Sequence, residues 1–64
     1  MYDSWDFDFI DENGNLSGRA SGESLAVVVA EVASEVVHYT CDAVRLEVYG
    51  VTDGARTLVS QTEI

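Results

Sequence analysis

Aromatic and acidic residues alternate along the segment SWDFDFID, from Ser4 to Asp11. In a strand, side chains two positions apart share a face. One face of this segment therefore carries the large rings Trp5, Phe7 and Phe9. The other face carries the carboxylates Asp6 and Asp8. We predict a strand whose rings enter a core and whose carboxylates face solvent.

The pair Asn13-Gly14 follows this strand and predicts a two-residue type I′ turn, because both central residues of that turn need a positive φ. Glu12 then pairs with Asn15, and Leu16 joins the face of the rings. The same register sets Phe9 opposite Gly18, Phe7 opposite Ala20 and Asp8 opposite Arg19. Rings thus meet residues with small or no side chains, and a carboxylate meets a guanidinium in a cross-strand pair worth a fraction of a kcal/mol.

A helix is predicted from Gly22 to Tyr39, with Ser21 as its N-cap and Glu23 in its first turn. Its core stripe consists of Leu25, Val28, Val29, Val32 and Val36. The opposite side carries Glu23, Val27, Glu31, Ser34, Glu35 and His38. The many valines favour a strand instead, but length and the polar stripe favour the helix.

A second apolar flank widens this helix beyond what one small sheet needs: Ala26, Ala30 and Val37. Two explanations stay open. The flank forms the seam of a homodimer, or the edge of the sheet half-buries it.

The C-terminal part predicts a second hairpin. Its first strand runs from Ala43 to Thr52, with Val44, Leu46 and Val48 inward and Arg45, Glu47 and Tyr49 outward. Asp53-Gly54 is a second hairpin turn. The last strand runs from Thr57 to Glu63. A two-residue loop turns Val59 inward, whereas a bulged three-residue loop turns Leu58 inward.

These elements predict an α+β fold of order ββαββ: one four-stranded antiparallel sheet with one helix packed on one face. The other face stays open to solvent or to a partner. We expect it to carry Asp6, Asp8, Ile10, Arg19, Arg45, Glu47 and Tyr49. Residues 1–64 are expected to form a single domain.

Charge adds the main functional indication. Twelve acidic residues face three arginines and no lysine, so the net charge is −9 at pH 7. Such a chain repels nucleic acid and anionic membranes and attracts basic partners. The alternative is that the acidity only keeps a small domain soluble or suits it to high salt. Because of its negative charge, the chain is not expected to bind nucleic acid or a membrane directly.

The chain is short, and it has a single cysteine. A domain of this size buries only roughly 60% of its unfolded surface. An intrachain disulfide is impossible, so stability requires a tight small core, an oligomer or a bound partner. The N-terminus has no basic segment typical of a signal peptide. The longest apolar run, Leu25 to Ala30, is too short to cross a bilayer, and we expect a cytoplasmic protein.

No catalytic, metal or cofactor site is predicted. His38 and Cys41 lie three residues apart, but a metal site needs about four ligands and the chain has no other His or Cys. The segment from Asp11 to Asn15 lacks the residue order of a calcium loop. Paired carboxylates on a flat, wet sheet face lack the desolvated pocket that acid–base catalysis needs. We therefore do not expect an enzyme.

The carboxylates instead suggest a binding role. Asp6 and Asp8 are roughly 6.5–7 Å apart along their strand, close to the separation of successive phosphates. We expect an acidic protein that mimics the charge of nucleic acid and blocks a basic nucleic-acid-binding surface of a partner. The residues expected to bind that partner are Asp6, Asp8, Asp11, Glu12, Glu31, Glu35, Glu47 and Tyr49.

In size, charge and simple topology the chain resembles the small acidic inhibitors that phages encode, anti-CRISPR and anti-restriction proteins among them. This resemblance covers no motif and transfers no residues; it implies action in the cytoplasm of a host cell. A hairpin leading into an amphipathic helix is also similar to some antitoxin domains. The alternative function is a structural homo-oligomeric accessory domain whose acidity serves solubility.

Overall fold

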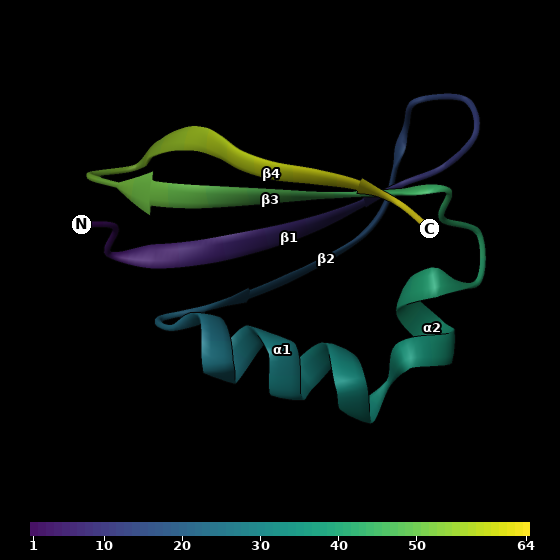
Figure 1. The fold of residues 1–64 in the computed structure, drawn as a ribbon, viewed down its shortest axis with the longest axis horizontal. Helices are drawn as coiled ribbons and strands as arrows, with labels where there is room; N and C mark the ends of the chain where they lie inside the picture. Colours follow the sequence, from purple (N-terminus) through teal and green to yellow (C-terminus); the bar gives the residue numbers. More distant parts are fainter.

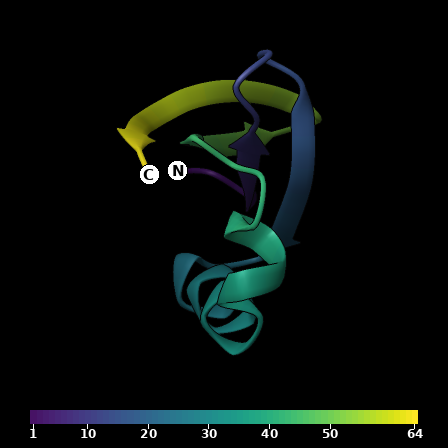
Figure 2. The ribbon, with the colours of Figure 1, turned by 90° about the vertical axis from the view of Figure 1, so that its right-hand side faces the viewer.

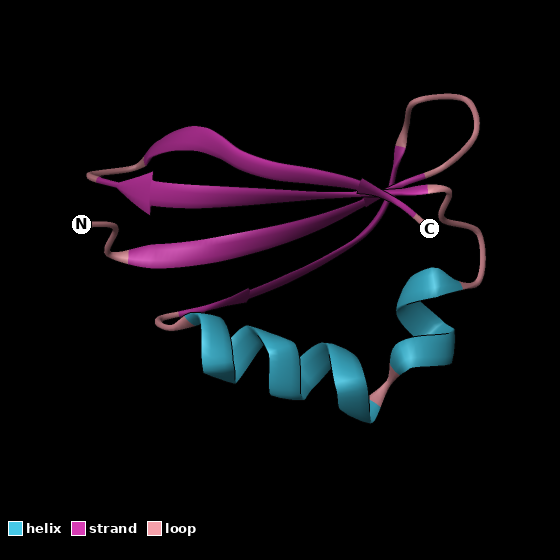
Figure 3. Ribbon diagram, viewed as in Figure 1, coloured by secondary structure: helices cyan, strands magenta, loops and turns pink.

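Two β-hairpins joined by a helical segment make up the computed structural model, which describes residues 1–64 (Figures 1 and 3). The elements are β1 (Ser4–Ile10), β2 (Leu16–Gly22), α1 (Leu25–Ser34), α2 (Val36–Thr40), β3 (Arg45–Thr52) and β4 (Ala55–Glu63). The strands form one antiparallel sheet in the order β2-β1-β3-β4. The predicted α+β fold with a four-stranded antiparallel sheet is confirmed, with two helices in place of one.

The first hairpin has the predicted register over most of its length. The predicted pairs are all present: Phe9 with Gly18, Phe7 with Ala20 and Asp8 with Arg19. The prediction of a two-residue turn is wrong, however. Gly14 has a φ of 83°, whereas Asn13 is not in the positive-φ region. Asp11 pairs with Asn15 around a three-residue loop, and the backbone N–H of Gly14 donates to the Asp11 carbonyl.

Two irregularities in this hairpin cancel each other. The longer loop shifts the register by one residue, and a bulge at Ser17 shifts it back, so that Ile10 pairs with Leu16 and Phe9 with Gly18. The Asp11 carboxylate stabilises the longer loop by accepting the backbone N–H groups of Asn13 and Asn15, each at 2.9 Å.

Two side-chain positions predicted for this hairpin are wrong. Leu16 was expected on the face of the rings, but its pairing with Ile10 moves it to the opposite face, where it is half exposed. Ile10, expected on the open side of the sheet among exposed groups, lies between Leu16 and Arg45 and is buried.

The helix starts later than predicted. Ser21 and Gly22 extend β2, where the Ser21 hydroxyl donates to Asp6 at 2.8 Å. The N-cap is Ser24, whose side chain accepts the backbone N–H of Val27 at 3.3 Å. Glu23 consequently precedes the helix and is absent from its first turn.

The predicted single helix is broken at Glu35, which has a non-helical φ of −136° and ψ of 42°. The break shows as a short loop between α1 and α2 (Figure 3). Beyond it, α2 turns so that the Tyr39 ring stacks on Phe9, with ring centroids 5.3 Å apart. Val36, predicted in the core stripe, leaves that stripe at the break and is half exposed.

The second hairpin turns as predicted at Asp53-Gly54, whose φ values are 51° and 81°. Because the loop has two residues, Arg56 pairs with Val51. A bulge at Val59 then sets Leu58 opposite Tyr49 and Ser60 opposite Val48. Neither Leu58 nor Val59 is buried.

The core is small and lies on one half of the sheet. Its fully packed members are Phe7, Phe9, Ala20 and Val28, with Trp5, Val32, Tyr39, Ala43, Leu46 and Val48 partly buried around them. The helices pack against β1 and β2. Figure 2 shows β4 at the far end of the curved sheet from the helices, and every residue of β4 is exposed. Neither α1 nor α2 has the length and apolar content that a membrane crossing requires.

Candidate functional site

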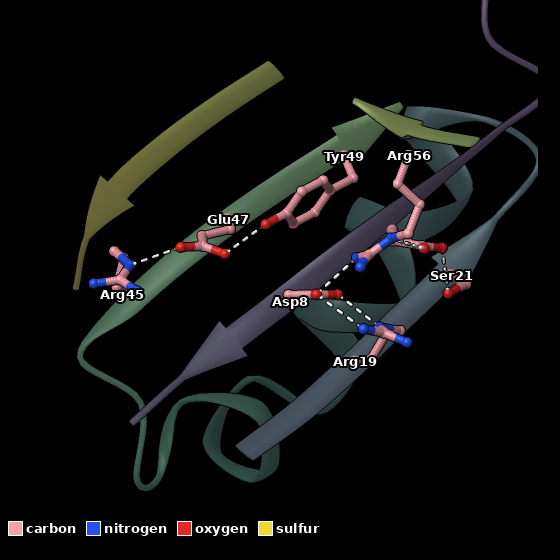
Figure 4. A network of polar contacts seen from close by, with 8 residues as sticks. Asp8, Arg19, Ser21, Arg45, Glu47, Tyr49 and Arg56 are labelled. Atoms are coloured by element: carbon pink, nitrogen blue, oxygen red, sulfur yellow. Dashed lines mark hydrogen bonds and ion pairs between the residues drawn. The ribbon is translucent and has the colours of Figure 1, made fainter. Parts of the chain in front are cut away.

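The sheet face turned away from the helices carries a polar network (Figure 4). We call it the open face and define it by the side chains Asp6, Asp8, Arg19, Arg45, Glu47, Tyr49 and Arg56. It holds all three arginines of the chain. Strand pairing brings these side chains together, because Asp8 on β1 lies between Arg19 on β2 and Glu47 on β3.

Asp8 is the centre of the open face. Arg19 donates to both of its carboxylate oxygens, from Nε to Oδ1 at 2.7 Å and from Nη2 to Oδ2 at 3.0 Å. Arg56 adds a third bond from Nη2 to Oδ2 at 2.7 Å. The two guanidinium groups cover the carboxylate so fully that only 6% of the Asp8 side chain is exposed. The predicted contact between Asp8 and Arg19 is thus confirmed, whereas the prediction that the Asp8 carboxylate faces solvent is wrong, because the two arginines cover it.

These contacts shift the ionisation of Asp8. Burial alone would raise the pKa of its carboxyl, but the hydrogen bonds and positive charges of Arg19 and Arg56 outweigh burial and hold the pKa below its usual value. In return, the hydrogen bonds with Asp8 raise the pKa of both arginines. Asp8 is therefore held as a carboxylate, which is the opposite of what a general acid requires.

Two further groups complete the open face. Asp6 accepts from Arg56 Nε at 3.0 Å and from the Ser21 hydroxyl. Glu47 accepts from Arg45 Nε at 3.0 Å and from the Tyr49 hydroxyl at 2.8 Å.

Tyr49 links the two parts of this network. The Arg56 guanidinium lies 4.0 Å from the centroid of its ring. Its hydroxyl donates to Glu47, and this hydrogen bond, together with burial, raises the pKa of Tyr49. Tyr49 therefore packs inside the open face and does not project from it as a free aromatic anchor.

The open face is consequently balanced in charge. Three of the eight residues predicted to bind a partner, Asp6, Asp8 and Glu47, are paired with the three arginines. Nine carboxylates remain without an arginine partner: Asp3, Asp11, Glu12, Glu23, Glu31, Glu35, Asp42, Asp53 and Glu63. The net charge of −9 therefore lies outside the open face.

Some of the unpaired carboxylates surround a hollow at the loop end of the molecule. We call it the acidic hollow; it has a volume of about 470 Å³ and is lined by Asp11, Glu12, Asn13, Cys41, Asp42, Ala43 and Val44. The backbone bond from Val44 N–H to the Ile10 carbonyl, at 2.8 Å, brings its two loops together. No group of three or more His, Cys, Asp or Glu side chains is arranged to hold a metal ion.

The structure divides the predicted binding residues into three places. Asp11 and Glu12 lie at the acidic hollow, and Glu31 and Glu35 lie on the helical segment. The Tyr39 hydroxyl donates a hydrogen bond to the Glu31 carboxylate at 3.4 Å. Burial and the nearby charges of Glu31 and Glu35 raise the pKa of Tyr39. Asp6, Asp8, Glu47 and Tyr49 lie in the open face.

The sequence pattern did not identify two residues that the structure places among the functional candidates. Arg56 was not assigned to any face, although the two-residue turn at Asp53-Gly54 sets it on the same face as Tyr49. Asp42 was not among the residues predicted to bind a partner. Its position beside Asp11 depends on the pairing of β1 with β3, which no local pattern encodes.

Comparison of the chain with protein-family models, with curated proteins and with solved structures found no match in any of the three.

Proposed function

We propose that this chain is a small acidic binding protein that mimics the charge of nucleic acid and blocks a basic nucleic-acid-binding surface of a partner protein. The observation that carries the proposal is the segregation of charge. All three arginines are committed to the open face, so nine carboxylates elsewhere have no cation beside them. A basic surface would supply the missing cations.

The charge density supports this role. The longest dimension of the molecule is 30 Å, and its net charge of −9 corresponds to one charge for about every 3.3 Å of that length. One strand of a DNA duplex carries a phosphate for about every 3.4 Å along the helix axis. The chain thus presents about the linear charge of a single nucleic-acid strand on a folded scaffold.

The acidic hollow is the proposed point of closest contact. Asp11, Glu12 and Asp42 line a concave space in which a lysine or arginine side chain of the partner would be surrounded by carboxylates. Glu31 and Glu35 on the helical segment extend the negative surface. In this proposal the carboxylates of the open face hold the scaffold together and contribute little to the attraction.

We propose no catalytic role. The open face holds its central carboxyl ionised between two arginines, and this supports a structural function for that group. The resemblance to phage-encoded inhibitors, anti-CRISPR and anti-restriction proteins, fits the proposed blocking activity in a host cytoplasm.

A second function, a structural homo-oligomeric accessory domain whose acidity serves solubility, is favoured by a different observation. The flank predicted as a dimer seam is exposed: Ala26 and Ala30 lie on the surface, and 76% of Val37 is accessible. Dimerisation through the apolar flank is compatible with partner binding, because the apolar flank and the acidic hollow are different surfaces.

The test is a pull-down from native cell extract with the immobilised chain, followed by elution in a salt gradient and mass spectrometry. We expect a basic nucleic-acid-binding protein that is released by rising salt and by added duplex DNA, because long-range charge drives the association. A chain that retains no such partner, or retains one regardless of salt and DNA, contradicts the proposal.

A matched pair of double variants locates the contact. Glu12→Gln with Asp42→Asn removes two charges at the acidic hollow, whereas Asp3→Asn with Asp53→Asn removes two at the opposite end of β1 and β3. We expect the first pair to weaken binding about tenfold and the second by less than about threefold. Equal losses would mean that only the total charge matters.

A further inference from the structure

Helix α1 is apolar on three of its four sides. Residues four apart in a helix form rows along its surface. The apolar rows are Val28 with Val32, Leu25 with Val29 and Ala33, and Ala26 with Ala30, the last of which ends at the polar residue Ser34. The remaining row contains Val27 and Glu31, the only charged residue of the helix. A helix that is apolar around most of its circumference is normally enclosed by protein.

Only one of these rows is covered in the isolated chain. Val28 is fully buried against the sheet, and Val32 packs beside it. Val29 is 52% exposed, and Ala26, Ala30 and Ala33 are exposed as well. The sequence of α1 thus suits an enclosed helix, while its own sheet covers only one side of it.

An apolar groove lies beside the uncovered side of α1. Its volume is about 270 Å³, and its lining residues are Phe7, Phe9, Val29, Val32, Ala33, Thr40, Leu46 and Ile64. The groove exists because α1 packs over β1 and β2, so that the inner side of β3 is only partly covered and that of β4 is exposed. No charged side chain lines it, although fifteen of the 64 residues are charged.

We propose that this apolar groove and α1 form the interface of a homodimer, in which α1 of each copy enters the groove of the other. The absence of charge identifies the occupant. A basic partner would find no carboxylate in the groove, whereas two chains of net charge −9 can approach each other only through a surface free of carboxylates. The groove and the exposed rows of α1 are such a surface, and they are complementary in chemistry.

A dimer interface of ordinary size would cover a modest share of the chain's surface. A specific interface covers about 800 Å² of each partner, and the chain exposes 4114 Å², so about one fifth of its surface would be covered. Large apolar residues that are exposed in the isolated chain include Leu25, Val29, Val36, Val37 and Ile64. Covering them would enlarge a core that has only five buried hydrophobic residues.

This inference specifies the interface of the alternative homo-oligomeric function and does not depend on the proposed charge mimicry. Salt affects the two in opposite directions, because it screens the repulsion between two acidic copies but weakens attraction to a basic partner. Dimerisation should strengthen as salt rises, and partner binding should weaken. Failure of one therefore says nothing about the other, and each can be measured separately.

The test compares two substitutions on the same helix by sedimentation velocity across a concentration series. Val29→Glu puts a carboxylate in the groove. Val27→Glu adds the same charge on the row of Glu31, at a residue with a similar exposure of 55%. Both valines are exposed, so both variants should keep the wild-type circular dichroism spectrum of the folded monomer.

We expect the wild-type chain to sediment at twice its 7.0 kDa mass. Val29→Glu should raise the dimer dissociation constant by at least about tenfold, since it buries an unpaired charge, and Val27→Glu by less than about threefold. A wild-type chain that stays monomeric at high-micromolar concentration and high salt overturns the proposal. Equal weakening by both variants, or occupation of the groove by a different protein alone, overturns it as well.

Discussion

Asp8 is the residue on which the open face depends most. Its carboxylate is nearly inaccessible and receives three hydrogen bonds from Arg19 and Arg56. Without it, two guanidinium groups would face each other across a strand with no anion between them. The arginines themselves are partly exposed, at 42% and 33% of their side chains, so solvent moderates the loss.

Replacing Asp8 with Asn should lower the free energy of unfolding by about 2 kcal/mol, because the amide cannot accept the same bonds from both arginines. Asp6→Asn is the matched control. Its carboxylate is more accessible and bonds one arginine, and its loss should be about 1 kcal/mol. Urea unfolding measures both, and a larger loss at Asp6 would contradict this account of the open face.

The pH dependence of the same variant tests the ionisation of Asp8. The pKa of Asp8 is lower in the folded chain than its ordinary value of 3.8. Its contribution to stability is therefore complete above that value and is lost as the pH falls through the lower folded pKa. The stability difference between wild type and Asp8→Asn should be constant near neutral pH and shrink below about pH 3.8. A difference that grows on acidification contradicts the assignment.

At the scale of elements, the helical segment differs most from the single continuous helix that the sequence pattern predicts. Ser24 caps the start of the helix, because Ser21 and Gly22 belong to β2 and pair with β1. Its break at Glu35 lets Tyr39 stack on Phe9. The short α2 thereby closes one end of the core that α1 alone does not reach.

Ser24→Ala should lower the free energy of unfolding by about 1 kcal/mol and reduce the helical circular dichroism signal, because the N–H of Val27 loses its acceptor. Ser21→Ala removes only the hydroxyl contact with Asp6, so it should leave the helical signal unchanged. If Ser21→Ala instead reduces helicity more strongly than Ser24→Ala, the helix begins where the sequence pattern predicted.

At the scale of the whole molecule, unbalanced charge opposes folding. The arginines neutralise only the open face, and the nine remaining carboxylates repel one another when the chain is compact. Raising the salt concentration from about 0.01 M to about 0.1 M shortens the screening length from about 30 Å to about 10 Å. The longest dimension of the molecule is 30 Å, so most of this repulsion should be screened.

We therefore expect the free energy of unfolding to increase by about 1 kcal/mol over this range of salt. Urea unfolding should be measured with Val29→Glu, so that dissociation of a dimer does not contribute. A decrease with salt would mean that the ion pairs of the open face dominate the electrostatics of the fold.

Local patterns predicted the four strands and most of their faces, although the bulge at Ser17 turns Leu16 to the opposite face. The alternation of rings and carboxylates assigns Phe7 and Phe9 to the core and Asp8 to the other face, since neighbouring side chains of a strand point in opposite directions. The turn at Asp53-Gly54 followed from backbone preferences alone. The register of the first hairpin was right only because a longer loop and a bulge cancel, which the sequence does not reveal.

Features that join distant parts of the chain were decided by the tertiary structure. Arg56 reaches Asp8 across β3, the acidic hollow brings Asp42 to Asp11, and the helix breaks at Glu35 so that Tyr39 meets Phe9. Residue periodicity records only which way a side chain points from its own element. Which elements become neighbours depends on strand order and packing, and these decided which carboxylates are neutralised and which remain free to attract a partner.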